Sequence, residues 1–287
     1  MNAAETYPLT SRLTTSGGES LALFDWPLDP GLRSRGLVLL VHGLGEHALR
    51  YDALAGAFNA WGFAVRAFDQ YGHGQSSGPR GGLPSDTRLL DDLAAVLDRS
   101  RHQFGAQTPL LLLGHSMGGL VAARFVALGL RPVDALVLSS PALDPGLNPV
   151  QKLLLAVLPG IVPNLRVGNG LDARLISHDS AVVAAYKADP LVHDRISGRL
   201  GGFIAQGGPA AVAQAPQWQV PTLLLYAGAD KLVNPAGSRA FAAAAPAAML
   251  RSHCFESLYH EIFNEPESER SAVMAVLRDW LDTRFAL

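Results

Sequence analysis

The stretch from Leu110 to Leu120, with the sequence LLLLGHSMGGL, constrains the fold of this chain more than any other. Four leucines are typical of a buried strand, and the small residues after them are typical of the start of a tightly packed helix. Between the two lies the pattern G-x-S-x-G, which in this context places Ser116 at the tip of a sharp turn. Glycines flank the serine because side chains there would strike the neighbouring strand or helix. The first amides of the helix would then face any anion that forms at Ser116.

Apolar runs and helical patterns alternate along most of the chain. Strands are expected at Leu37–Val41, Phe63–Phe68, the four leucines before Gly114, Val133–Leu138, Thr222–Ala227 and Ala248–Phe255, with a hairpin over Leu13–Pro27. Helices are expected over Arg50–Trp61, Thr87–Phe104, Ser116 to about Leu130, Pro235–Ala245 and Glu267–Phe285. Because the connections are short, this alternation predicts an α/β fold with a mostly parallel central sheet and helices on both faces.

The alternation stops after Ser140-Pro141 and resumes only near residue 217. Between them lie short helical patterns separated by Pro, Gly and Asn, with no clear buried strand. We therefore expect residues 1–142 and 217–287 to form the core domain and residues 143–216 to form a helical cap inserted over one end of the sheet. Within the cap, Gly198–Gly208 is rich in glycine and Val150–Val162 is strongly apolar.

Composition excludes several classes of function. The chain has 287 residues, 48% of them hydrophobic, and a net charge of −2, which gives no electrostatic footprint for nucleic acid. A single cysteine, Cys254, excludes an intrachain disulfide. No metal-ligand spacing such as H-E-x-x-H occurs, so neither a metal nor another cofactor is expected. Since the first twenty residues lack a basic and an apolar segment, and Leu153–Val162 is interrupted by Pro159 and Gly160, we expect a soluble cytoplasmic protein.

A serine hydroxyl becomes a nucleophile only when a base takes its proton and a third group orients that base. In this strand–turn–helix setting the acid and the histidine follow the serine along the chain, each on a loop after a strand. Asp230 follows the apolar run at Thr222–Ala227, and His260 lies between the last strand and the last helix. We expect Asp230 to accept a hydrogen bond from His260, and His260 to deprotonate Ser116.

Other histidines and acids are less suited to these roles. His253 falls inside a strand, and His47 and His73 precede the serine, as does Asp69, while Asp189 and Asp194 lie in the insertion. Asp69, His73 and His42 are expected to hold loops in place.

The oxyanion that forms during acyl transfer needs two preorganised donors. The amide of Met117, the residue after the serine, is one expected donor. The other is the amide of Leu44, in the loop that follows Leu37–Val41.

Three motifs carry a resemblance to the monoacylglycerol lipase and lysophospholipase-like family of α/β-hydrolases. They are His42-Gly43-Leu44-Gly45-Glu46-His47 with Arg50-Tyr51 behind it, Asp69-Gln70-Tyr71-Gly72-His73-Gly74-Gln75-Ser76, and Gly114-His115-Ser116-Met117-Gly118-Gly119. Leu158-Pro159, Pro163-Asn164-Leu165 and Asp189-Pro190-Leu191 also resemble that family's cap.

The resemblance implies the α/β-hydrolase fold and an ester hydrolase with a lipid-like acyl substrate. It implies that Glu46, Arg50 and His115 line the polar end of the pocket, although Glu46 is equally suited to bracing a loop. The cap would form the acyl tunnel, and its apolar helix at Val150–Val162 would make weak contact with a membrane surface or pack on the core.

The sequence thus predicts a cofactor-free serine esterase that forms an acyl-enzyme on Ser116, with monoacylglycerols, lysophospholipids or simple carboxylic esters as substrates. A prolyl-type aminopeptidase would use the same three residues, with Asp172, Asp179 or Asp189 holding the substrate ammonium. A non-catalytic ligand-binding protein on the same fold is the remaining alternative.

Overall fold

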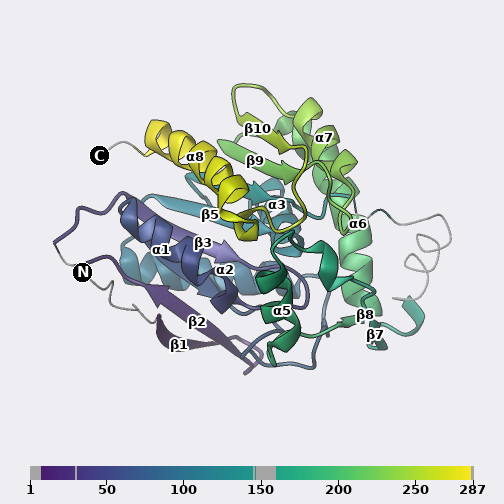
Figure 1. Cartoon of the computed structure of the whole chain (residues 1–287). Coiled ribbons are helices and arrows are strands. Elements are labelled where there is room, and N and C mark those ends of the chain that lie inside the picture. Colours follow the sequence, from purple (N-terminus) through teal and green to yellow (C-terminus); the bar gives the residue numbers. More distant parts are fainter. Residues whose placement is uncertain (1–7, 30, 145, 147–159, 286–287) are drawn as a thin grey trace.

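A twisted eight-stranded sheet forms the centre of the computed structural model, which describes residues 8–29, 31–144, 146 and 160–285 (Figure 1). The strands lie in the order β1-β2-β4-β3-β5-β6-β9-β10. Their bounds are β1 (Leu9–Thr14), β2 (Ser20–Trp26), β3 (Gly36–Val41), β4 (Phe63–Phe68), β5 (Leu110–His115), β6 (Ala135–Ser139), β9 (Thr222–Ala227) and β10 (Leu250–Phe255). The six strands from β4 to β10 run parallel, whereas β1 and β2 form the expected antiparallel hairpin at one edge.

Two apolar layers hold the helices against the sheet. Successive side chains of a strand point to opposite faces, so Leu110 and Leu112 of β5 join one core while Leu111 and Leu113 join the other. Helices α1 (Asp52–Ala60) and α8 (Glu267–Arg284) cover one face, and α2 (Arg88–Phe104), α3 (Met117–Ala127) and α7 (Pro235–Ala244) cover the other (Figure 1). The expected parallel sheet with helices on both faces is confirmed.

Helix α3 ends three residues before the expected end near Leu130. Gly129 adopts a φ of 61° and donates its amide to Val126 O, and the amide of Leu130 donates to Phe125 O. These two bonds form a Schellman motif, in which a left-handed glycine ends a helix. The glycine determines the boundary, although Leu130 continues the apolar pattern.

The segment between β6 and β9 adds no strand to the main sheet. In its described part, residues 143–144, 146 and 160–216, it forms a short ribbon of β7 (Arg166–Gly168) and β8 (Arg195–Ser197), then α5 (Ser180–Ala188) and α6 (Gly198–Gln214). The pattern predicted neither the ribbon nor a long helix over the glycine-rich stretch. Most of the apolar helix expected at Val150–Val162 lies outside the described residues, and the division at residues 143 and 216 stays a prediction.

Helix α6 begins in the glycine-rich stretch because its start is capped and its side is tightly packed. The hydroxyl of Ser197 accepts a hydrogen bond from the amide of Leu200 at 3.2 Å, as an N-cap residue does. A Cβ on Gly208 would overlap the carbonyl oxygen of Leu143, and one on Gly207 would lie 3.4 Å from Leu120. Glycine costs a helix about 1 kcal/mol per residue, and here it lets α6 approach the core closely enough to bury Leu200.

Replacing Gly208 with alanine should therefore destabilise the chain despite alanine's higher helix propensity. The added methyl group would strike the main chain at Leu143, and we expect a loss of about 1–3 kcal/mol in the free energy of unfolding. Gly56, in the middle of α1, provides the control, because nothing lies within 4 Å of its missing Cβ. Gly56→Ala should stabilise by up to about 1 kcal/mol. Urea unfolding of both variants checks this, and equal stabilisation by the two would show that α6 is not closely packed.

Candidate active site

Ser116 lies at a strained turn between β5 and α3. Its φ of 54° and ψ of −120° are rare for a residue with a side chain and match the sharp turn expected from the sequence. The glycines of the motif permit this turn, since a Cβ on Gly114 would overlap Gly118 O and one on Gly118 would overlap Val41 O. The amide of Ser116 donates to Ser139 O at 2.9 Å, which fastens the turn to β6.

His260 and Asp230 meet beside this turn, as expected. His260 Nδ1 donates to Asp230 Oδ2 at 2.7 Å, and both side chains are buried. Asp230 Oδ1 accepts the amides of Leu232 at 2.8 Å and Val233 at 3.0 Å, so the carboxylate is fully occupied. Because Nδ1 of the imidazole is occupied by Asp230, Nε2 is the nitrogen left for a partner on the other side of the ring.

The electrostatics of the pair favour ionised Asp230 and a basic histidine. Burial alone would raise the pKa of Asp230, but the charge and hydrogen bond of His260, with the two amides, lower it below 3.8. Burial alone would lower the pKa of His260, and Asp230 outweighs it, so the pKa of this imidazole rises above 6.5. His260 is thereby a stronger base than a free imidazole.

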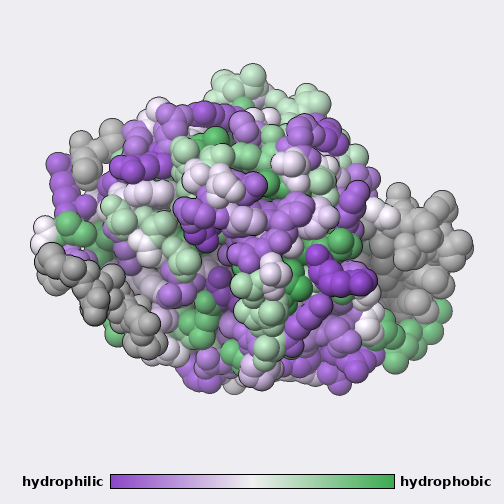
Figure 2. Space-filling model, viewed as in Figure 1, coloured by the Kyte–Doolittle hydropathy of each residue, from purple (hydrophilic) through white to green (hydrophobic). Residues whose placement is uncertain are grey.

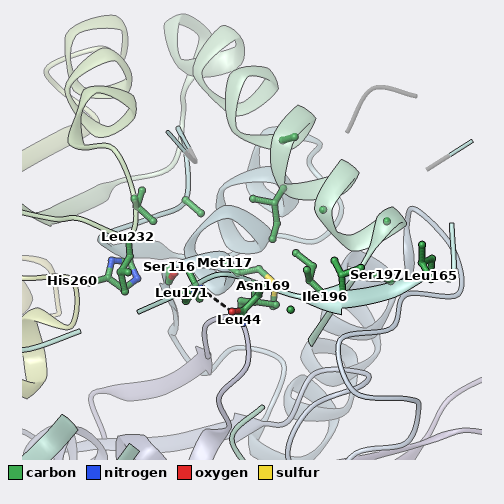
Figure 3. A pocket seen from close by; sticks show the side chains of 18 of the residues that line it. Leu44, Ser116, Met117, Leu165, Asn169, Leu171, Ile196, Ser197, Leu232 and His260 are labelled. Atoms are coloured by element: carbon green, nitrogen blue, oxygen red, sulfur yellow. Dashed lines mark hydrogen bonds between the residues drawn. The ribbon is translucent and has the colours of Figure 1, made fainter. Parts of the chain in front are cut away.

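Ser116 and His260 line two cavities of different size, of which Figure 3 shows the larger. The larger cavity has a volume of about 390 Å³, and most of its walls are apolar. Its lining residues include Leu44, Met117, Leu165, Ile196, Ile204 and Leu232. The smaller cavity, of about 30 Å³, is also largely apolar, and Glu46, His115, Tyr186 and Glu261 add polar groups to its wall. The candidate nucleophile and base therefore lie where the two cavities meet.

The two expected oxyanion donors lie beside the serine. Leu44 and Met117 both line the larger cavity with Ser116. Among the described residues no acceptor takes the amide of either one. The loop that carries Leu44 is held by Gly43, whose amide donates to Glu46 Oε1 at 2.6 Å. In the part of the chain that the structure describes, both amides are thus free, that of Leu44 in a fixed loop and that of Met117 at the first position of α3.

Glu46 and Arg50 form a buried brace instead of a free pair of binding groups. Arg50 donates to Glu46 Oε2 at 2.6 Å and to both oxygens of Glu261 at 2.7 and 2.8 Å. Tyr51 OH donates to the other oxygen of Glu46, and the ring of Tyr186 covers the guanidinium at 4.6 Å. Of the two interpretations left open for Glu46, this geometry favours the loop brace.

Glu261 is the participant that sequence reasoning missed. It directly follows His260, so Arg50 connects the loop of Leu44 to the loop of the histidine. A carboxylate next to a candidate catalytic histidine was the available signal.

His115 is buried next to His260. Its Nδ1 lies 3.0 Å from Ser139 Oγ, and the two imidazole centroids are 4.8 Å apart. Burial, with the nearby charge of His260, lowers the pKa of His115 to about 3, so this ring stays neutral. It lines the smaller cavity, and its role in binding the polar end of a substrate stays a prediction.

The remaining candidates occupy structural positions. Asp69 accepts the amides of Ala48 and Gln75, and His253 lies on β10, away from both cavities. Asp189 accepts a hydrogen bond from His47 Nε2 at 2.7 Å, which ties the cap to the core. Within residues 8–29, 31–144, 146 and 160–285, no group of three metal-binding side chains occurs, and no helix is long and apolar enough to cross a bilayer.

Apolar side chains lie exposed around the larger cavity. Leu165 and Val167, which line it, are 58% and 51% exposed, and Ile161 nearby in the chain is 70% exposed. On the face shown in Figure 2, apolar surface gathers at the end of the molecule where β7 and β8 lie. The wall of this cavity is thus apolar on its outer side as well as its inner side.

Comparisons with known proteins agree with this geometry. The family described as "Serine aminopeptidase, S33" matches residues 33–267. A monoacylglycerol lipase of Mycolicibacterium smegmatis is 36% identical over 88% of this chain and 90% of its own length. An abhydrolase domain-containing protein of Dictyostelium discoideum is 34% identical over 96% of this chain, which spans 29% of that longer protein.

A solved structure gives the same result for the fold. The crystal structure of a monoacylglycerol lipase from Paleococcus ferrophilus superposes with a TM-score of 0.81 at 36% identity, over 91% of this chain and 99% of that one. The chain has the α/β-hydrolase fold and belongs to the monoacylglycerol lipase-like serine hydrolases of the S33 family.

Proposed function

We propose that this protein hydrolyses carboxylic esters that have an apolar acyl chain, through an acyl-enzyme on Ser116. The observation that carries the proposal is the apolar cavity of about 390 Å³ that ends at Ser116 and His260. An aliphatic chain buried there gains about 25 cal/mol for each Å² of apolar surface removed from water. The adjoining cavity of about 30 Å³, with His115 and Tyr186 in its wall, would face the alcohol side of the ester.

The chemistry proceeds in two halves with His260 moving one proton in each. His260 Nε2 takes the hydroxyl proton as Ser116 Oγ bonds to the ester carbon, and the carbonyl oxygen becomes an oxyanion that accepts the amides of Leu44 and Met117. His260 then gives that proton to the departing alcohol as the C–O bond breaks. Water next loses a proton to His260 and attacks the acyl carbon, and Ser116 leaves with the proton returned. Asp230 stabilises the imidazolium throughout.

Monoacylglycerols are the proposed substrates within this class. The side chains of His115 and Tyr186, which line the small cavity, would offer polar groups to the hydroxyls of a glycerol leaving group. The relatives from M. smegmatis and P. ferrophilus are named monoacylglycerol lipases, which supports the choice. Lysophospholipids and simple esters share the acyl chain and differ on the alcohol side. The exposed Leu165 and Val167 would let the cap touch a lipid surface weakly while substrate enters.

The acidic residues of the cap do not favour the aminopeptidase alternative. Asp189 is bonded to His47, Asp172 to Arg174, and Asp179 accepts the amide of Ala181 at the start of α5. None of the three lines either cavity at Ser116. A substrate ammonium would have no free carboxylate there.

Ser116→Ala should abolish ester hydrolysis and labelling by a fluorophosphonate probe while leaving the fold intact, because the nucleophile is removed and nothing else changes. The measurement is hydrolysis of p-nitrophenyl esters together with the far-ultraviolet circular dichroism spectrum. Ser252→Ala, on the exposed strand β10, is the control and should behave like the wild type. Residual turnover by Ser116→Ala at more than about a thousandth of the wild-type rate would contradict the acyl-enzyme.

A substrate series tests the finer proposal. We expect a monoacylglycerol to be hydrolysed with higher kcat/KM than a lysophosphatidylcholine of the same acyl chain or an amino-acid arylamide. Preference for the arylamide would identify an aminopeptidase. An unlabelled and inactive wild type would identify a ligand-binding protein.

The acid limb of the pH profile should reflect His260. Because the pKa of His260 is raised above 6.5 and the base must be neutral, kcat/KM should fall as pH drops, with an apparent pKa above 6.5. His115, with a pKa of about 3, does not titrate in this range. Asp230→Asn removes the charge that raises the pKa, so the surviving activity should have its inflection at lower pH. Hydrolysis rates from pH 5 to 9 check this, and a flat wild-type profile would rule out His260 as base.

Arg50→Met should leave Glu46 and Glu261 buried without their shared partner. Breaking a buried ion pair in this way costs about 3–5 kcal/mol of folding stability. The turnover should fall as well, because the brace joins the loops of Leu44 and His260. Arg131→Met, which removes an exposed pair with Asp98, is the matched control and should change neither property appreciably. Urea unfolding and kcat measure the two effects, and equal behaviour of both variants would show that the brace has no role.

A further inference from the structure

Three histidine rings connect the cap to the loop that carries Leu44. His193 lies in the cap just before β8, His73 lies in the loop after β4, and His42 follows β3. The ring centroids of His193 and His73 are 4.7 Å apart, and those of His73 and His42 are 5.3 Å apart. His42 and His73 are completely buried. The proposed acyl transfer uses none of these rings.

The main chain of His193 fastens the cap to the residue after Leu44. The amide of His193 donates to Gly45 O at 2.8 Å. A Cβ on Gly45, whose φ is 78°, would overlap the carbonyl oxygen of His193. The cap segment at His193, just before β8, thus lies directly against the loop of the proposed oxyanion hole.

The hydrogen bonds of the rings determine their tautomers. His42 Nε2 accepts the amide of Gln70 at 2.9 Å, so Nδ1 carries the hydrogen and donates to Gly43 O at 2.7 Å. His73 Nδ1 lies 3.0 Å from Tyr71 O and must donate, which leaves Nε2 as an acceptor.

His193 has the complementary tautomer. Its Nδ1 accepts the amide of Arg195 at 3.2 Å, so its hydrogen is on Nε2. Nε2 of His73 and Nε2 of His193 are both buried, and neither has a hydrogen-bond partner among the described residues. The two Nε2 atoms do not bond to each other, and the ring N–H of His193 faces the carbonyl of Gly72, the residue before His73.

The hydrogen bond from His42 Nδ1 to Gly43 O orients the amide of Leu44. Gly43 C=O and Leu44 N–H belong to one planar trans peptide unit, so a partner that fixes the oxygen also fixes the direction of the N–H. His42 Nδ1 is that partner. The position of the His42 ring, packed against His73, is consequently linked to the direction of the proposed oxyanion donor.

Burial keeps the three rings neutral. His193 faces the guanidinium of Arg80, the ring of His42 and the carboxylate of Asp194, and burial followed by Arg80 lowers its pKa to about 4. Burial and the neighbouring histidines lower the pKa of His73 well below 6.5, and Arg80 acts in the same direction. Burial also lowers the pKa of His42, and it outweighs Asp69 and Glu46, which raise that pKa. Neutral rings are what the tautomer assignment requires.

We propose that His193 is a positioning residue, which holds the Leu44 amide in the oxyanion hole through Gly45 and through the rings of His73 and His42. The inference rests on the proposed ester hydrolysis. If His193 has this role, the chemical step itself requires that the cap contacts the core at Gly45. This requirement adds to any role of the cap in binding the acyl chain.

The test compares His193→Leu and His193→Gln with the wild type on p-nitrophenyl acetate and p-nitrophenyl laurate. Leucine removes the Nε2 donor, and we expect kcat to fall by about tenfold on both esters, with KM within about twofold. Glutamine can supply an N–H to the carbonyl of Gly72, beside His73, and should restore kcat to within about threefold of the wild type. His253→Leu, an exposed histidine on β10, is the control and should match the wild type. A loss confined to KM for the laurate would show that His193 serves only acyl binding and would overturn the proposal.

Amide hydrogen exchange of the peptide that covers residues 42–47 separates this inference from the proposed function, because it needs no substrate. Exchange should be faster in His193→Leu than in the wild type at pH 7. Exchange of the same loop should also become faster in the wild type below pH 5. The ring of His193 has a pKa of about 4 when the cap is seated and of 6.5 when it is free, so the seated cap is fully stable above 6.5 and loses stability as pH falls toward 4. Faster exchange in a chain that cleaves no ester would keep the coupling and reject the function. An active wild type whose exchange and kcat are both unaffected by His193→Leu would reject the coupling.

Discussion

The contact between Gly118 and the end of β3 is the constraint on which the site depends. With no side chain at this position, the first turn of α3 lies directly against the carbonyl oxygens of Val41 and His42. Two consequences follow from this one approach. The helix start, with the amide of Met117, comes beside the loop that leaves β3 with the amide of Leu44, and both line the cavity at Ser116. The turn between β5 and α3 must also be sharp, which accounts for the positive φ of Ser116.

Buried charge around this turn gives His115 and His260 opposite tendencies. Arg50 satisfies Glu46 and Glu261 together, and burial keeps the ring of His115 neutral. The pKa of His260 is raised, because this histidine meets the carboxylate of Asp230. Similar imidazoles in one small volume thus have opposite tendencies, and the difference arises from their partners.

The sequence was sufficient for those features that depend on local pattern. Largely apolar runs such as Phe63–Phe68, which contains the buried Arg66, and Thr222–Ala227 coincide with the strands residue for residue, since such a run is typical of a strand buried on both faces. Features that depend on what packs against a segment could not be predicted from the sequence. Helix α6 contains glycines that local rules treat as breakers, and only the closeness of Leu143 and Leu120 explains them. Glu261 and His193 take part through partners that are distant in the chain, so no spacing rule could select them.

The cap is attached to the core in a way that explains why its sequence is the least predictable part. Three of its junctions are main-chain hydrogen bonds, from the amide of His193 to Gly45 O, from that of Ser197 to Gly81 O, and from that of Glu261 to Ile176 O. Such bonds need an extended backbone and room for it, which the core provides, since a Cβ on Gly45 or Gly81 would overlap the cap's carbonyl oxygens. Cap side chains that point to the core add to this seat, such as Asp189 through His47 and Arg199 through the carbonyl oxygens of Leu83 and Pro84. Those that face the cavity are not needed for it and are free to change with the acyl chain. Gly45 and Gly81, whose carbonyl oxygens accept the cap's amides, cannot be replaced in the same way. Gly45 belongs to the loop that carries the proposed oxyanion donor.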